Sequence, residues 1–288
     1  MTEKSQKASG RDEVVVRAVP GHGLTGLLDL RELWEYRDML RFLVIRDFIS
    51  KYKQTVLGPA WFVLQPLLMS VVFTVIFSRF AGISTDSVPP ILFYLCGQLG
   101  WSFFQISLTG TAGNLINNAD LFKKVYFPRV IVPLAGVLSN LIALALQTLL
   151  FFGFWTYFKF FSGAGDSFGM GTGVVFFPLL VAQTAALSLG LGLWLSALSA
   201  KYRDLHHLTP FLVQILLYLT PVIYPISQVP EAFRSLVMLN PLAAVVESFR
   251  HIFLGVPAVT WVETAYSLGM TGLILFSGWM VYERIQAN

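Results

Sequence analysis

Residues 46–66 read RDFISKYKQTVLGPAWFVLQP, and within them the chain changes from charged to apolar. Four charged side chains stand in residues 46–53, and no further charge follows until Arg79. Gly58 gives the backbone unusual freedom, and Pro59 has no N–H to donate to a preceding turn. We therefore expect the chain to turn a corner here and to begin a new helix with proline in its first turn.

The composition of the whole chain is that of a membrane protein. Of its 288 residues 55% are hydrophobic and 12% are charged, whereas soluble proteins carry about 25% charged residues. Ten of the twenty Lys and Arg residues fall in residues 1–54. We predict a polar tail at 1–28, which lacks the apolar core of a signal peptide, an amphipathic helix at 29–55, and a membrane domain at 56–288.

Six stretches are long and apolar enough to cross a bilayer as helices, which takes about 20 residues. The short connections that follow the even-numbered stretches carry Lys and Arg, which places them in the cytoplasm by the positive-inside rule. An even number of spans puts both termini on that side. The sequence therefore predicts an all-α polytopic membrane protein with spans at 57–79, 91–113, 130–158, 174–199, 208–226 and 259–282.

The predicted helix before the first span has apolar residues mostly three or four positions apart, with charged residues between them. This is the pattern of a helix with one apolar stripe. Such a helix lies in the headgroup layer, where its basic side chains meet anionic lipid. It is either an ordinary anchoring helix or a lever that transmits motion through the corner at Gly58.

The connection NNADLFKKVYFPR, residues 117–129, is too apolar for a solvated loop and too charged for lipid. An asparagine can cap a short helix here, and Pro128 would end it. If Leu121 and Phe122 are exposed on that helix they invite a protein partner. The alternative is that both side chains tuck under the helical bundle.

Five prolines divide residues 220–257 into pieces. We predict helices at 231–239 and 242–254, which are too short to span. They are typical of re-entrant half-helices, whose backbone must be covered by protein or water. Glu247 and Arg250 stand three residues apart on one face and can pair, either in a water-filled vestibule or as a structural clamp.

The sequence has no Walker A motif, no zinc motif and no nucleophile with a recognisable base. By itself the chain is therefore not expected to hydrolyse ATP, to hold a metal or to act as an enzyme. Nothing in it indicates nucleic-acid binding.

Four segments resemble the permease subunits of type-2 ABC exporters, and among these the O-antigen and polysaccharide branch that includes teichoic-acid and capsule permeases. The segments are RDFISKYKQTVLGPAWFVLQPLL (46–68), NNADLFKKVYFPRVIVPL (117–134), AKYRDLHHL (200–208) and NPLAAVVESFRHIFLG (240–255). The resemblance implies six spans with an N-terminal interface helix and re-entrant helices before the last span. It also implies a homodimer in the bacterial inner membrane that exports a lipid-linked polysaccharide, flanked by two ATPase subunits that bind ATP and Mg.

The resemblance also implies roles for individual residues. The joint between interface helix and first span becomes a gate hinge, and spans one and five would line a conduit at the dimer interface. The helix that docks on the ATPase, the coupling helix, would be formed by Asp120, Leu121, Phe122, Lys123 and Lys124, and the gate hinge by Leu57, Gly58 and Pro59.

A conduit for sugars needs polar groups that match the sugar hydroxyls. It also needs flat apolar faces. The candidates on the lining spans are Trp61, Gln65, Phe73, Phe77, Gln214, Tyr218 and Tyr224. Buried glutamine is also common as a bond between helices, and aromatic residues are common in any membrane span. At the entrance Arg46, Lys51 and Lys53 would attract a lipid pyrophosphate, or only meet phospholipid.

Two other functions fit the same pattern. One is a type-2 exporter of a small amphipathic lipid or drug. The other is a membrane enzyme or assembly factor that acts on lipid-linked glycans without ATP.

Overall fold

The computed structural model describes residues 34–51, 53, 55–118, 121, 127–202, 204–257 and 259–287, and these contain helices and no strand. The α-helices are α2 (Arg37–Ser50), α3 (Trp61–Phe73), α4 (Pro90–Ala112), α5 (Asn114–Asn117), α7 (Ile131–Phe160), α8 (Phe177–Lys201), α9 (Asp204–Leu219), α10 (Glu231–Met238), α11 (Pro241–Leu254) and α12 (Trp261–Ala287). A π-helical turn, Thr74–Phe80, continues α3. The predicted tail at 1–28 lies outside the described residues.

Within the described residues, five helical stretches are long and apolar enough to cross a membrane, and a bent helix pair would make a sixth. They lie close to the predicted spans, and the expected all-α polytopic fold is confirmed. The five are Gly58–Phe80, Pro90–Ala112, Ile131–Phe160, Gly173–Lys201 and Trp261–Ile285.

The fifth predicted span, 208–226, is wrong in its extent. The helix there is α9, which has 16 residues and ends at Leu219. Pro221 explains the early end, because a proline disfavours the helical conformation at the residue before it. At 1.5 Å per residue, α9 covers about 24 Å, less than the roughly 30 Å of a hydrocarbon core.

The predicted pair of half-helices is confirmed. α10 and α11 meet at a bend of 103°. The Asn240 side chain caps α11 by accepting a hydrogen bond from the Leu242 N–H. Gly255 ends α11 in the left-handed conformation, with φ 71°, which glycine adopts without steric cost.

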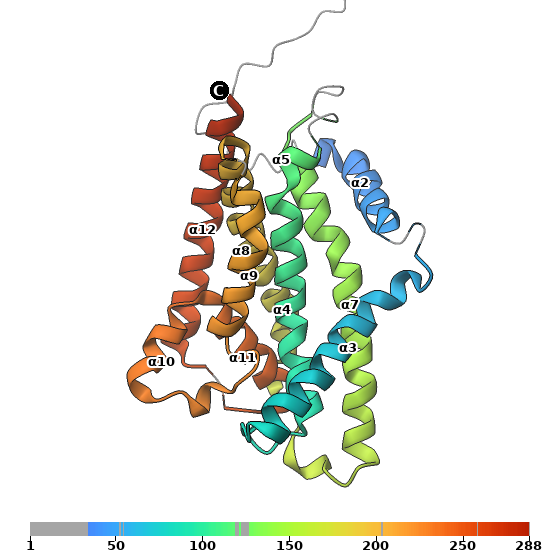
Figure 1. The fold of residues 1–288 in the computed structure, drawn as a ribbon, viewed down its shortest axis with the longest axis vertical. Helices are drawn as coiled ribbons and strands as arrows, with labels where there is room; N and C mark the ends of the chain where they lie inside the picture. The colour runs from blue at the N-terminus through green and yellow to red at the C-terminus, as the bar shows by residue number, and fades with distance from the viewer. Residues whose placement is uncertain are drawn as a thin grey trace, which may run out of the picture.

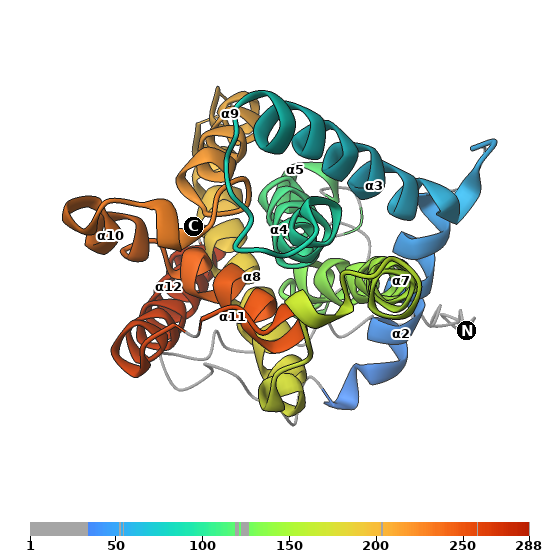
Figure 2. The ribbon, with the colours of Figure 1, turned by 90° about the horizontal axis from the view of Figure 1, so that it is seen from below.

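α4 is the central helix of the bundle, and Figure 2 shows α3, α7, α8, α9 and α11 arranged around it. On the side of α8 away from α4, α12 packs closely against α8 because a glycine of each helix faces the other. A Cβ atom on Gly278 would lie 2.2 Å from the carbonyl oxygen of Gly190. Small residues permit such close backbone approach between membrane helices.

α2 lies beside the bundle at the end where α5 and the C-terminal end of α12 also lie, and α10 and α11 lie toward the opposite end (Figure 1). The sequence predicted one apolar stripe on this helix, but the structure has two. Leu43 is buried on the side that packs against α7. Phe42 and Ile45 belong to a second apolar set that is exposed on the opposite side.

Candidate functional site

The corner between α2 and α3 forms at the expected glycine. Gly58 has φ +53°, in the left-handed region, and no described atom lies within 4 Å of where its Cβ would stand. The backbone conformation, and not a lack of space, therefore favours glycine. Pro59 follows in a short 3-10 turn, Gly58–Ala60, that leads into α3.

Pro66 lies inside α3 and interrupts its hydrogen bonds, and a neighbouring helix compensates. Pro66 has no N–H, so the carbonyl of Phe62, four residues earlier, loses its usual partner. Gln147 of α7 donates from Nε2 to that oxygen at 3.1 Å. This bond ties α3 to α7 within the membrane domain.

The predicted conduit residues fall into three groups by their exposure. Trp61, Gln65, Gln214 and Tyr218 are exposed on α3 and α9, and Gln214 Nε2 donates to the Tyr218 hydroxyl at 3.4 Å. Phe73 is buried, with its ring 5.8 Å from that of Tyr94. The other two predicted residues, Phe77 and Tyr224, are half-buried.

Gln65 and Gln214 meet at one polar cavity of about 260 Å³ between α3, α4, α7 and α9. Its buried part is formed by residues that the sequence analysis did not single out. These are Gln98, Trp101, Ser102 and Gln147, with half-buried Gln105 beside them.

The spacing of polar residues in the second span was the signal for this cavity. Positions 98, 102 and 105 stand four and three residues apart, which places them on one face of α4. In an otherwise apolar helix such a stripe indicates a polar surface inside the bundle.

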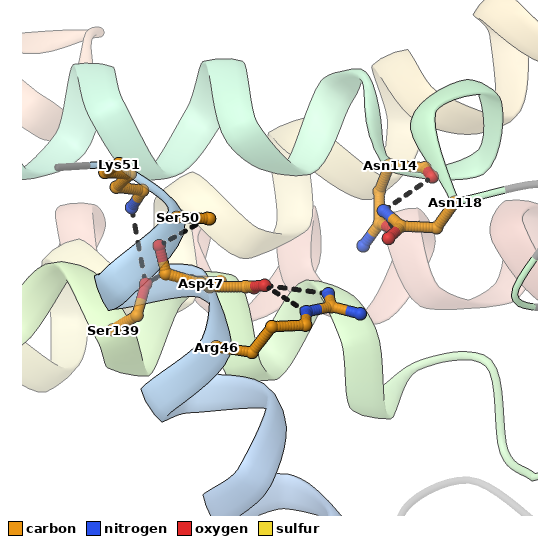
Figure 3. Close-up of polar contacts among 8 residues, drawn as sticks. Arg46, Asp47, Ser50, Lys51, Asn114, Asn118 and Ser139 are labelled. Carbon is orange, nitrogen blue, oxygen red and sulfur yellow. Dashed lines mark hydrogen bonds and ion pairs between the residues drawn. The ribbon is translucent and has the colours of Figure 1, made fainter. Parts of the chain in front are cut away.

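Two of the three predicted entrance cations, Arg46 and Lys51, contact different partners (Figure 3). Arg46 pairs with the carboxylate of Asp47 at 2.7 Å, and Lys53 is exposed. Lys51 turns toward α7, where its Nζ donates to Ser139 Oγ at 3.3 Å and to Asn140 Oδ1 at 2.5 Å.

Lys51 and Asp47 line a second polar cavity, of about 320 Å³, together with Asn114, Asn118 and Asn140. Burial lowers the pKa of the Lys51 ammonium group, and the Asp47 carboxylate opposes that shift. Asn118 Nδ2 donates to Asn114 Oδ1 at 2.9 Å. The cavity thus offers one cation and several amides at the end of the bundle where α2 lies.

Leu121 is the one predicted coupling residue among those that the structure describes. It is half-buried and packs against the cluster formed by Leu43, Phe127, Ile131, Val132 and Ala135. Its side chain therefore tucks under the bundle. Asp120, Phe122, Lys123 and Lys124 lie outside the described residues.

Glu247 and Arg250 form the expected pair, with Arg250 Nη1 2.8 Å from Glu247 Oε1. Both side chains are buried, with exposed fractions of 3% and 0%. This burial favours the structural clamp over the water-filled vestibule.

The Arg250 guanidinium also holds the loop that follows α9. Nη1 donates to the carbonyl oxygen of Pro221 at 2.5 Å, and Nη2 donates to that of Val222 at 2.7 Å. The Phe93 ring lies beneath the guanidinium, 3.7 Å from Cζ. A Cβ on Gly97 would come within 2.8 Å of Nη2, so glycine leaves the room that the guanidinium needs.

The family model described as ABC-2 type transporter matches residues 39–254 of the chain. The chain belongs to this family. It is therefore a membrane permease subunit of an ABC transporter, and the family implies a separate ATPase subunit as its partner.

Individual relatives are similar to the permease over most of their length. "O-antigen export system permease protein RfbA" of Myxococcus xanthus is 31% identical over 78% of this chain and 83% of its own. The protein of that name from Klebsiella pneumoniae is 27% identical over 83% and 91%. "Polysialic acid transport protein KpsM" of Escherichia coli is 23% identical over 84% and 91%.

We predict that Arg250→Leu in the permease lowers the free energy of unfolding by roughly 3–5 kcal/mol, because it leaves the Glu247 carboxylate buried without its partner. The measurement is denaturant unfolding of the purified protein in detergent. Arg234→Leu is the matched control. Arg234 pairs with Glu263 at 3.4 Å and is 41% exposed, so its loss should cost about 0–1 kcal/mol. Equal losses in both variants would contradict the clamp.

Proposed function

We propose that this permease, as a homodimer with two ATPase subunits, exports a lipid-linked polysaccharide across the bacterial inner membrane. Both termini then lie in the cytoplasm, and ATP and Mg are bound by the partner subunits. The relatives named as O-antigen export permeases support this class of substrate.

The observation that carries the proposal is the amide-lined cavity between α3 and α9. Its glutamines stand near the middle of their helices, at positions such as 98 in Pro90–Ala112 and 147 in Ile131–Phe160. Amides exposed to hydrocarbon at that depth are costly because lipid offers no hydrogen-bond partner. We infer that the α3 and α9 face borders a hydrated conduit, lined by Trp61, Gln65, Gln214 and Tyr218, with Phe77 and Tyr224 beside them.

Phe73 is left out of the proposed lining because it is buried within the chain. At the entrance we assign the lipid pyrophosphate to Lys51, whose ammonium group borders the second polar cavity. Arg46 is less suited, because the neighbouring carboxylate already neutralises it. Lys53 is exposed and adds a cation at the membrane surface.

One observation favours the other transport function, export of a small amphipathic compound. An apolar groove of about 530 Å³ lies between α7 and α8, lined by residues such as Leu144, Phe152 and Phe177. Apolar pockets of this size suit drug-like ligands. A groove on the outside of a bundle also accommodates an acyl chain of the bilayer, so we favour the polar cavity as the transport route.

Deletion of the gene for this permease should cause lipid-linked glycan to accumulate on the cytoplasmic side while surface glycan disappears. Glycan is measured at the cell surface with a lectin or antiserum, and in lipid extracts by mass spectrometry. The intact gene should restore export, and Lys51→Gln should restore it only partly. Unchanged surface glycan in the deletion strain would overturn the proposed function.

The proposed coupling helix around Asp120, Leu121, Phe122, Lys123 and Lys124 is tested by Phe122→Asp. A charge at the docking surface should prevent co-purification of the ATPase subunit and abolish export. Phe161→Asp places the same charge on an exposed residue at the opposite end of α7, and should leave the ATPase bound. If Phe122→Asp retains the ATPase and exports normally, the assignment is wrong.

The proposed gate hinge at Leu57, Gly58 and Pro59 is tested by Gly58→Ala. A left-handed conformation costs alanine roughly 1–2 kcal/mol, so the variant should slow export by up to about thirtyfold while still inserting in the membrane. Gly58→Asn tolerates that conformation and should export more nearly like the wild type. Gly153→Ala is the control, since Gly153 is helical with open space around it. Equal export by all three variants would contradict the hinge.

A further inference from the structure

The cavity between α3, α4, α7 and α9 gathers nearly all the glutamines of the membrane helices around it. Between residues 58 and 219 the chain has six glutamines, and five of them line this one cavity. The sixth, Gln183, joins α8 to α12 by donating from Nε2 to Ser267 Oγ at 2.8 Å. A single glutamine between helices is explained as a bond of that kind, but five around one space are not.

The buried amides beside the cavity leave part of their hydrogen-bonding capacity unused. Gln147 donates a hydrogen bond from Nε2 to the Phe62 carbonyl. Its Oε1 is buried and receives no hydrogen bond from any residue that the structure describes. Gln98 is 5% exposed and receives one bond, at 3.3 Å, from Ser102 Oγ. Buried amide groups without partners are costly, so the cavity must admit water or a polar ligand.

The shape of the cavity suits a ligand that enters from one side. Its deep wall is formed by buried Gln98 and Gln147, and its rim by exposed Gln65 and Gln214. A volume of about 260 Å³ holds several waters and lies near the lower end of small-molecule sites. The opening therefore faces the same side as the proposed conduit.

The chemistry of the lining selects the class of ligand. None of the described residues that line the cavity is charged, so this lining offers no cation to a carboxylate or phosphate. Primary amides donate and accept hydrogen bonds, which matches the hydroxyl and acetamido groups of neutral sugars. The indole of Trp101 adds an aromatic surface for sugar C–H groups.

We propose that this glutamine cavity is a binding subsite for neutral, hydroxyl-rich sugar units of the passing glycan, an inference that rests on the proposed function. Neutral hydrogen bonds are individually weak in net free energy. A moving chain is thus guided by exchangeable contacts and is not held at one position. The subsite favours neutral over acidic units.

The test uses the complete transporter, permease with its ATPase, in lipid nanodiscs. The probes are a neutral dextran oligosaccharide and a galacturonate oligosaccharide of matched length. Binding is followed by quenching of tryptophan fluorescence, and Trp101→Phe identifies the signal that arises in the cavity. We expect the wild type to bind the neutral probe and to bind the acidic probe at least tenfold more weakly.

The decisive variant is Gln98→Leu combined with Gln105→Leu, which keeps the volume of the lining and removes two amides. We expect it to weaken binding of the neutral probe by about tenfold, equivalent to about 1.4 kcal/mol. Gln183→Leu is the matched control, because it removes a buried amide outside the cavity, and it should bind like the wild type. If the double variant does not fold, Gln105→Leu alone serves, since Gln105 is half-buried at the cavity.

Three results would overturn the subsite. They are equal binding by the double variant and the wild type, tighter binding of the acidic probe, and no binding of the neutral probe by the wild type. Export by the same variants in the deletion strain separates this inference from the proposed function. Wild-type permease that restores export, with the leucine variants exporting equally well, would contradict the subsite and leave the function intact. Failure of the wild type to restore any export would contradict the function itself.

Discussion

Hydrocarbon offers a polypeptide backbone no hydrogen-bond partner, and this chain breaks its helices within the membrane domain. At Pro66 the lost bond is replaced by Gln147, which joins α3 to α7. After Leu219 the helix ends, and Arg250 collects the carbonyls of Pro221 and Val222. Each break is therefore also a link between elements distant in sequence, so the polar side chains determine which helices lie together.

The same constraint divides the bundle into two kinds of packing. α8 and α12 approach closely through Gly190 and Gly278, and this contact leaves no space for a ligand. α3 and α9 instead border a cavity whose walls are amides. Close glycine packing is rigid, whereas an amide-lined space accepts water and polar groups of varying shape. We therefore expect the substrate on the α3 and α9 side of the bundle. The α8 and α12 side would form the rigid part of the fold.

Much of the fold could be predicted from the sequence, because length and hydropathy determine membrane spans and prolines determine their breaks. The half-helices around Asn240 and the corner at Gly58 are examples. The end of α9 was missed by seven residues, since the apolar character of the chain continues past Leu219 although its helix does not. Hydropathy indicates whether a segment is stable in lipid. The end of α9 is instead determined by Pro221, which disfavours the helical conformation at the residue before it.

The candidate site was less predictable, because a sequence does not state which polar residues share a cavity. Gln65 and Gln214 were identified from their spans, but Gln98, Gln105 and Gln147 were not, although the spacing on α4 was visible. Phe73 was expected at the conduit and is buried, since aromatic type alone does not give the direction of a side chain. The three entrance cations stand within residues 46–53 of the sequence, yet of these Lys51 is the one that turns inward to α7.

That inward turn gives α2 a second connection to the membrane domain besides the corner at Gly58. Lys51 bonds to Asn140 of α7, and Asn140 Nδ2 donates to Ser107 Oγ of α4 at 3.1 Å. Ser107 stands two residues beyond Gln105, on the helix that forms the wall of the glutamine cavity. A displacement of α2 therefore acts on α3 through the covalent corner and on α4 through this chain of hydrogen bonds. The two walls of the cavity are thus connected to one surface helix in two different ways, one by the covalent corner and the other by a series of hydrogen bonds.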